Sequence, residues 1–191
     1  MYAASQPFQF GKGAALGVKT LGNVRADPNW IGFLLACARY EVHAVTITLT
    51  RGLIAQIFEH LERAYPNEGG GFLLGRLSRS GDAQIVRIRP IENVAAQEEQ
   101  YHRYAMTPAD WARLEDEADA LGLALIGYYH SHPDSPAIPS EYDRAHALPN
   151  FHYLIAAVQA AKATELRAWQ LAEDRSAFTE LALNILEDSQ N

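Results

Sequence analysis

The chain has 191 residues, of which 48% are hydrophobic and 20% are charged, with a net charge of −7. This size fits one globular domain with its own core, and a second full domain would be crowded. The negative charge argues against a non-specific nucleic-acid binder, because such proteins gather positive charge to displace counterions. The single cysteine, Cys37, excludes an intrachain disulfide framework and a cysteine-based zinc site. A cytoplasmic location is the default expectation.

The first 40 residues differ from the rest in charge and pattern. They contain five glycines and four basic residues against one acidic residue, without a sustained helical or strand period. We therefore interpret residues 1–40 as a flexible amino-terminal extension or an upstream start, and residues 41–191 as the folded domain. The apolar run at residues 30–37 is far shorter than the roughly 20 residues that span a membrane, so no membrane span is expected.

Beyond residue 40 the sequence shows the two periodicities of regular secondary structure. Alternating apolar residues predict strands, and apolar residues at every third or fourth position predict helices. Thr107, Pro108 and Asp110 combine a cap, a proline at the first helical position and an acidic third position, which indicates a helix start. In chain order we predict a strand at 45–49, a helix at 53–65, a hairpin of strands at 72–77 and 83–91, an edge strand at 101–106, a helix from 107, a buried strand at 121–129 leading into residues 130–132, a short helix at 140–148, strands at 151–158 and 166–171, and a final strand or helix at 178–186.

The most informative motif follows the buried strand. His130 and His132 are separated by one residue, and seven further residues separate His132 from Ser140, which precedes Asp143 by three. On a strand, residues i and i+2 face the same side, so the two imidazoles should project together, and the following loop could return Asp143 to them. Two histidines and one carboxylate leave one position open, which is typical of catalytic rather than structural metal sites.

An open metal site of this kind needs a separate proton acceptor. Glu68 is the best candidate, because it lies between the end of a predicted helix and the start of a strand, next to three consecutive glycines. Glycines allow the backbone to approach closely beside that carboxylate.

Together these residues resemble the JAMM family of metalloproteases, also called MPN+ or JAB domains, from about Thr46 through the last strand. The pattern is a Glu, then His-Ser/Thr-His, seven residues, Ser, two residues and Asp, and every element is present. The resemblance implies Zn²⁺ on His130, His132 and Asp143, and Glu68 as general acid and base. It implies that Ser140 hydrogen-bonds the attacking water or the tetrahedral intermediate. A cap of the short helix is the alternative role for Ser140.

The resemblance also implies a fold and a substrate. The expected fold is an α/β domain, similar to cytidine deaminases, with one mixed, mainly antiparallel sheet sandwiched by helices. The likeness is closest to small bacterial members, some of which hydrolyse the bond after the C-terminal Gly-Gly of ubiquitin-like sulfur-carrier proteins. We therefore expect a zinc metallopeptidase that releases cysteine or a short peptide from such a partner. Polyubiquitin is not expected, because the chain has little room for the two insertions of eukaryotic relatives.

Two alternatives stay open at this stage. The same site could serve a peptidase of cell-wall or phage type, or the domain could be a non-catalytic MPN-like scaffold. A serine hydrolase built on Ser131 and His132 is a poorer explanation, because adjacent strand residues point to opposite faces. The other histidines are expected on the surface or in packing contacts rather than as ligands. They are His43, His60, His102, His146 and His152.

Overall fold

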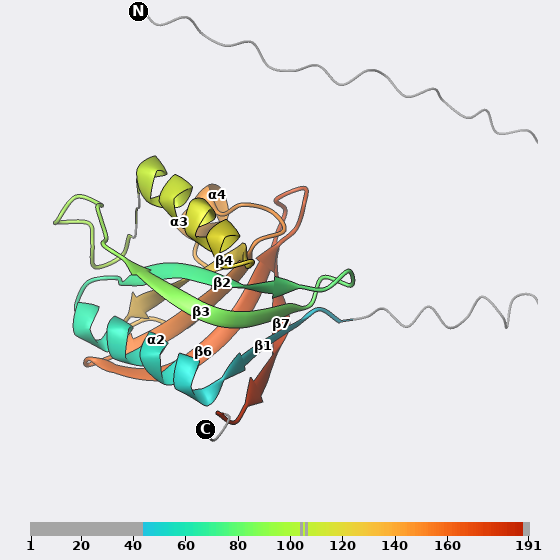
Figure 1. The fold of residues 1–191 in the computed structure, drawn as a ribbon. Helices are drawn as coiled ribbons and strands as arrows, with labels where there is room; N and C mark the ends of the chain where they lie inside the picture. Colours follow the sequence, from blue (N-terminus) through green and yellow to red (C-terminus); the bar gives the residue numbers. More distant parts are fainter. Residues whose placement is uncertain (1–43, 104, 106, 189–191) are drawn as a thin grey trace, which may run out of the picture. The chain divides into compact units, whose positions relative to one another are not determined.

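The computed structural model of the chain describes residues 44–103, 105 and 107–188 (Figure 1). The predictions for residues 1–40 lie outside this range. Seven strands and three helices form the described domain. They are β1 (Thr46–Thr50), α2 (Arg51–Ala64), β2 (Gly70–Leu77), β3 (Ala83–Ile91), α3 (Pro108–Ala120), β4 (Ala124–Pro133), α4 (Glu141–His146), β5 (His152–Gln159), β6 (Lys162–Leu171) and β7 (Phe178–Leu186).

The strands form one mixed sheet that closes into a barrel in the order β1, β3, β2, β4, β5, β6, β7. The pairs β2–β3, β2–β4, β5–β6 and β6–β7 are antiparallel, whereas β4–β5 and both pairings of β1 are parallel. The prediction of a mixed, mainly antiparallel sheet is confirmed. The expected sandwich of one sheet between helices is not found, because the strands close into a barrel. Because β1 pairs with both β3 and β7, the sheet has no free first and last strand.

Helices α2 and α3 pack on β2 through alternate residues of that strand. Leu73 joins the main core cluster, which includes Ile57 and Leu61 of α2. Phe72 and Leu74 instead pack with the buried face of α3 in a separate cluster. Successive residues of a strand point to opposite faces, so β2 receives one helix on each face. The two helices thus lie against opposite faces of the sheet, but the closed barrel is not the sheet sandwiched by helices that was expected.

Both helix starts follow from local sequence. Thr50 caps α2 by accepting a hydrogen bond from the backbone N–H of Leu53. Thr107 and Asp110 form a reciprocal capping box at the start of α3, with Pro108 at the first helical position, as predicted. These bonds satisfy N–H groups that have no partner inside a helix.

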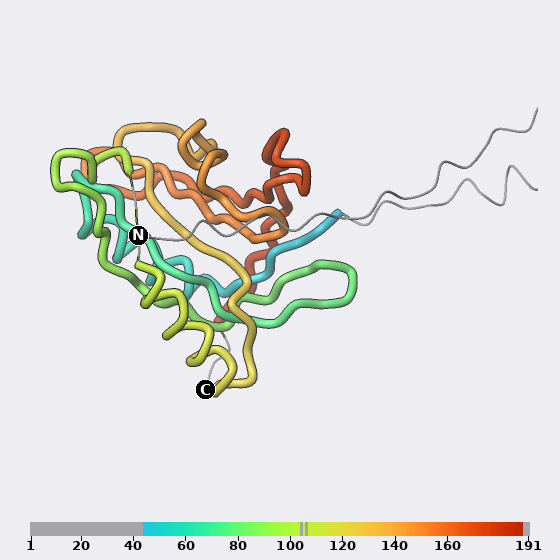
Figure 2. Tube along the Cα trace, turned by 90° about the horizontal axis from the view of Figure 1, so that it is seen from above, coloured from blue at the N-terminus to red at the C-terminus, as the bar shows by residue number. Residues whose placement is uncertain are grey.

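The predicted edge strand at 101–106 is wrong for the residues described there. Residues 97–102 form turns, and the segment between β3 and α3 projects beyond the strand ends as a loop (Figure 2). Hydrogen bonds from the side chains of Asn93 and Gln100, rather than a strand ladder, hold this loop. Residues 178–186, which were predicted to form a strand or a helix, form the strand β7. Of the helices that the structure describes, none is both long and apolar enough to cross a membrane.

Candidate metal centre

Strand β4 carries the two histidines at its carboxyl end. It is held on both sides, because Gly70 of β2 pairs with His130 and Ile155 of β5 pairs with the same residue from the other side. The side chains of His130 and His132 are buried, and their Nε2 atoms lie 3.1 Å apart. The predicted i, i+2 arrangement on one face of a strand is therefore present, and it brings two imidazole nitrogens together.

Helix α4 brings a carboxylate to the same point. Oδ1 of Asp143 lies 3.1 Å from Nε2 of His130, and Oδ2 lies 3.3 Å from Nε2 of His132. Ser140 caps α4: its backbone N–H and its hydroxyl both donate to Asp143 Oδ2 at 2.6 Å, and its Oγ accepts from the backbone N–H of Asp143 at 3.1 Å. The capping box thus fixes the orientation of the carboxylate toward the histidines.

Hydrogen bonds and charges prepare the three side chains for a cation. Nδ1 of His132 lies 2.9 Å from the carbonyl oxygen of Pro136, so an N–H at Nδ1 donates to that carbonyl and leaves the lone pair on Nε2. Burial opposes ionisation of Asp143, but the charges and hydrogen bonds of His130 and His132, with the Ser140 hydroxyl, lower its pKa well below its usual range. Burial opposes the charged form of His132, but the hydrogen bond and charge of Asp143, the Pro136 carbonyl and the charge of Glu68 together raise its pKa.

The three side chains fit a divalent metal ion. One ligand atom from each of His130, His132 and Asp143 lies within 4.8 Å of the others, and the closest approaches are 3.1 to 3.3 Å. Tetrahedral zinc with bonds of roughly 2.0–2.1 Å separates its ligand atoms by about 3.3–3.4 Å. Two imidazoles and a carboxylate are also a donor set that zinc accepts in catalytic sites.

Glu68 lies beside this centre, in the turn between α2 and β2. Its side chain is buried, and burial raises its pKa to about 7, although the nearby His130 and His132 act in the opposite direction. A carboxylate whose pKa is close to neutrality can both accept and return a proton. The structure therefore brings the predicted Glu68 to the predicted ligands, from a position 62 residues before His130.

Ser131, between the two ligands, ties the Glu68 turn to β4. Its Oγ accepts a hydrogen bond from the backbone N–H of Gly69 at 3.0 Å, and its own N–H donates to the carbonyl of Gly69 at 3.0 Å. Gly71 follows in β2, where an added Cβ would lie 2.8 Å from the ring of Tyr129 and 2.2 Å from the carbonyl oxygen of Arg89. The glycines thus allow the close approach that the sequence predicted.

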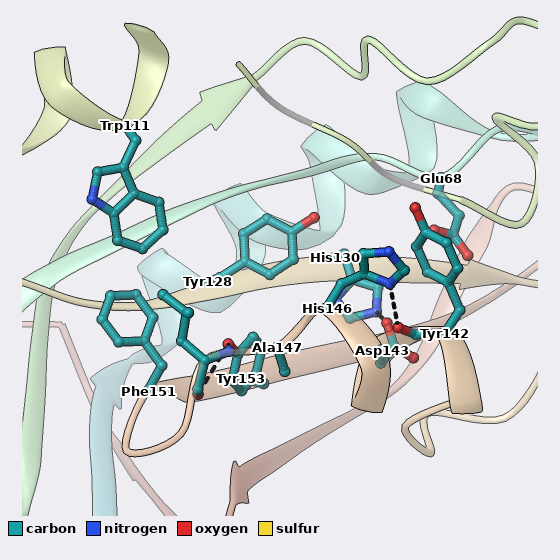
Figure 3. A pocket seen from close by; sticks show the side chains of 11 residues that line it. Glu68, Trp111, Tyr128, His130, Tyr142, Asp143, His146, Ala147, Phe151 and Tyr153 are labelled. Carbon is teal, nitrogen blue, oxygen red and sulfur yellow. Dashed lines mark hydrogen bonds and ion pairs between the residues drawn. The ribbon is translucent and has the colours of Figure 1, made fainter. Parts of the chain in front are cut away.

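Two pockets open on either side of Glu68. Figure 3 shows one of them, with Glu68, His130 and Asp143 at one end and Trp111 and Phe151 at the other. The rings of Trp111 and Phe151 stack with centroids 5.3 Å apart, so this end is apolar and aromatic. We call it the aromatic pocket; its full lining is Glu68, Trp111, Tyr128, His130, Tyr142, Asp143, His146, Ala147, Leu148, Phe151 and Tyr153.

The second pocket is more polar and lies toward the other ligand. We call it the polar pocket, and its lining includes Tyr101, His102, His132 and Ser140 as well as Glu68. Glu68 is thus shared by both pockets, while His130 faces one and His132 the other. An extended chain that bridges the two pockets would pass the metal centre.

The other histidines that the structure describes do not join His130, His132 and Asp143. His60 lies 3.0 Å from the hydroxyl of Tyr129, His146 stacks on Tyr142, and His152 is buried against the carbonyl of Ile126. His102 is exposed, and His43 lies outside the described residues.

Sequence reasoning missed several parts of the site. It assigned no site role to Trp111, to the carbonyl of Pro136, or to Asn93 and Gln100, which hydrogen-bond the backbone carbonyl and N–H of Glu68. An asparagine just after a strand is a weak signal, because such residues commonly satisfy nearby backbone groups in loops. The stacking of Trp111 on Phe151 depends on tertiary packing, for which the sequence carries no local signal.

Comparison with known proteins agrees with this geometry. Residues 50–172 match the family of prokaryotic homologues of the JAB domain. The chain is 31% identical over 113 residues to a probable TtuB-protein conjugate cleaving protease of Thermus thermophilus, covering 59% of this chain and 71% of that protein. It is 32% identical over 101 residues to a desampylase of Haloferax volcanii, covering 52% and 71%.

A solved structure agrees as well. The solution structure of protein DSY2949 from Desulfitobacterium hafniense aligns with a TM-score of 0.65 at 26% identity, covering 74% of this chain and 94% of that one. The match of the family model spans Glu68, both histidines, Ser140 and Asp143. The chain therefore belongs to the family of prokaryotic JAB-domain proteins, and its fold is the JAB/MPN fold.

Proposed function

We propose that this protein is a zinc-dependent hydrolase of the isopeptidase type that cleaves the bond following the C-terminal Gly-Gly of a ubiquitin-like sulfur-carrier protein. The observation that carries the proposal is the convergence of His130, His132 and Asp143 beside the buried carboxylate of Glu68. The curated relatives named for conjugate cleavage and desampylation support conjugates of ubiquitin-like proteins as the substrate class. The Gly-Gly end, the sulfur-carrier partner and a cytoplasmic location are parts of the proposal.

Each polar residue of the site has a separate task in this reaction. His130, His132 and Asp143 would hold the Zn²⁺, which when bound supplies a Lewis acid and lowers the pKa of water. Glu68 accepts the proton of the attacking water and then donates it to the leaving amine. Ser140, which lines the polar pocket, holds Asp143 through its hydroxyl and its backbone N–H; turning the hydroxyl would aim its single proton at the developing oxyanion while the N–H keeps its bond to Asp143.

The two pockets suggest how the substrate lies. Glycine has no side chain, so a Gly-Gly segment lets the substrate main chain come close to the metal centre between the two pockets. The aromatic pocket then receives an apolar side chain from the same substrate, because burying such a group against Trp111 and Phe151 is favourable. Residues 1–40 have no task in this proposal and are proposed to be an extension of the catalytic domain.

Cleavage of defined conjugates tests the proposal. The zinc-loaded full chain is incubated with a small ubiquitin-like protein whose Gly-Gly end carries cysteine, a peptide or a lysine-linked protein, and products are identified by mass spectrometry. We expect cleavage directly after Gly-Gly. Peptidoglycan fragments serve as a parallel substrate, and cleavage of these alone would identify a cell-wall peptidase instead. Binding of the conjugate without any cleavage would indicate a scaffold domain.

The matched variants are Glu68→Gln and Glu115→Gln. Removing the proton acceptor should lower turnover by about two to four orders of magnitude while the protein retains Zn²⁺. Glu115 is exposed on α3, outside both pockets, so its substitution should leave turnover unchanged. Undiminished turnover by zinc-loaded Glu68→Gln would remove Glu68 from this role.

A further inference from the structure

Asn93 connects the loop between β3 and α3 to the main chain of Glu68. Its Nδ2 donates to the carbonyl of Glu68 at 3.0 Å and to the carbonyl of Arg103 at 2.8 Å. Its Oδ1 accepts from the backbone N–H of Ala95 at 3.0 Å and of Ala105 at 3.2 Å. A primary amide has two N–H donors and two acceptor lone pairs, so every hydrogen-bonding position of this side chain is used.

Gln100 holds the other polar group of the Glu68 peptide. Its backbone carbonyl accepts from the N–H of Glu68 at 2.6 Å. Its side-chain Nε2 donates to the carbonyls of Asn93 and Ala95 at 3.1 and 3.0 Å, and its Oε1 accepts from Asn67 at 3.3 Å. Both backbone groups of Glu68 are therefore bonded to the same loop, and the Gln100 side chain also holds the backbone of Asn93.

The opposite side of this turn is fixed by β4, because Ser131 bonds both backbone groups of the next residue, Gly69. Residues 68 and 69 thus lie between the strand that carries the ligands and the loop that carries Asn93. Such restraint is needed, since a buried carboxylate gains solvation by turning toward water. Backbone bonds on both sides oppose that movement without consuming the carboxylate oxygens that the reaction needs.

We propose that Asn93 is a positioning residue, which holds the Glu68 main chain so that the carboxylate stays beside the metal ligands. This inference rests on the proposed function for the role of Glu68. The Asn93 side chain also couples Glu68 to the loop, because the amide that holds Glu68 also bonds Arg103 and Ala105 near the loop's far end. The loop supplies Tyr101 and His102 to the polar pocket. A substrate that contacts these residues therefore acts on the same hydrogen-bond network as the base.

Two substitutions of Asn93 separate positioning from folding. Asn93→Ala removes all four hydrogen bonds. Asn93→Asp keeps the shape and the acceptor for Ala95 and Ala105, but loses the donor and places a carboxylate oxygen against the carbonyl of Glu68. For the zinc-loaded variants we expect kcat to fall about 10- to 100-fold with KM and zinc content nearly unchanged, as for other displaced catalytic groups. Asn184→Asp, at an exposed position on β7, controls for the added charge.

Amide hydrogen exchange of the same proteins supplies a readout that does not depend on turnover. The N–H groups of Glu68 and Gly69 should lose protection in Asn93→Ala, whereas those of α2 should keep theirs. Unchanged protection at residues 68 and 69, or lost protection with an unchanged kcat, would overturn the positioning role. If the wild-type protein cleaves no conjugate, the proposed function fails, and the exchange measurement alone decides whether Asn93 clamps Glu68.

Discussion

Glu68, the proposed proton acceptor, is unfavourable for the stability of the fold. Its carboxylate is buried beside Asp143, and burial is the largest cause of its raised pKa. The protein therefore keeps a group whose charged form is less stable inside than in water. This arrangement makes a clear prediction about the metal-free protein.

The free energy of unfolding of metal-free protein should depend on pH through Glu68. Below about pH 4.5 the carboxyl is protonated in both folded and unfolded chains, and its neutral form is accommodated. As the pH rises, Glu68 ionises in the unfolded chain before it ionises in the folded chain, and this favours unfolding. By about pH 7 the free energy of unfolding is therefore lower by about 3 kcal/mol. We expect Glu68→Gln to be more stable than wild type at pH 8, by up to that amount, and similar at pH 4.

Urea unfolding of chelator-treated protein at both pH values measures the effect. Glu115→Gln, on the exposed face of α3, should differ from wild type by less than about 0.5 kcal/mol at each pH. An equal stability difference for Glu68→Gln at pH 4 and pH 8 would contradict ionisation as the cause.

Ser140 and Thr107 allow helix capping to be separated from metal binding. Both begin a helix with a reciprocal capping box, but only Ser140 bonds the ligand Asp143. Either change to Ala should lower stability by about 1 kcal/mol. Ser140→Ala should also weaken Zn²⁺ binding about 10- to 100-fold, whereas Thr107→Ala should leave it unchanged. Competition with a chromophoric chelator gives the affinities, and equal affinities for the two variants would limit Ser140 to capping.

At the scale of elements, sequence predicted the local part of the site and missed what depends on folding. His130, Ser140 and Asp143 lie within fourteen residues, so strand geometry and one loop bring them together. Glu68 was a candidate from its place beside three glycines, and the family pattern then joined it to these residues, because no periodicity relates residues so far apart. Asn93 was missed because its partners belong to the Glu68 turn and to both parts of its own loop.

The aromatic pocket should influence substrate choice. Trp111→Ala removes one wall, so KM for a conjugate with a large apolar residue near the cleavage site should rise about tenfold or more, whereas a conjugate with alanine there should change little. Leu121→Ala, at the exposed carboxyl end of the same helix, is the matched control. An unchanged ratio of kcat/KM between the two conjugates would exclude the pocket from substrate selection.

At the scale of the whole molecule, barrel closure was the part of the fold that sequence could not predict. Alternation identifies β1 as a strand, and the segment of β7 was predicted only as a strand or a helix; neither pattern reveals that Thr46 pairs with Ala182. Pairing between distant strands depends on the complete core, which joins Ile47, Leu154 and Val158 with α2. Most individual elements were nevertheless predicted, because their periodicity and capping residues are local.

Metal binding should stabilise the folded molecule as a whole. The three ligands join β4 to α4, and they converge only in the folded chain, so Zn²⁺ at about 100 times its Kd should add about 2.7 kcal/mol to the free energy of unfolding. Thermal unfolding with and without Zn²⁺ measures this gain as a higher Tm. His130→Ala should abolish the gain, and His102→Ala, at an exposed position, should retain it. Equal gains for both variants would place the ion elsewhere.

The alternation of His130, Ser131 and His132 along β4 also limits how this site can change during evolution. Neighbouring residues of a strand face opposite sides, and a shift by one residue exchanges the sides. A one-residue deletion between Gly127 and His130 that kept the pairing with β5 would turn both ligands away from Asp143 and remove Ser131 from Gly69. Substitutions can therefore alter the centre one residue at a time, but a change in the length of β4 removes the ligands and the support of the base together.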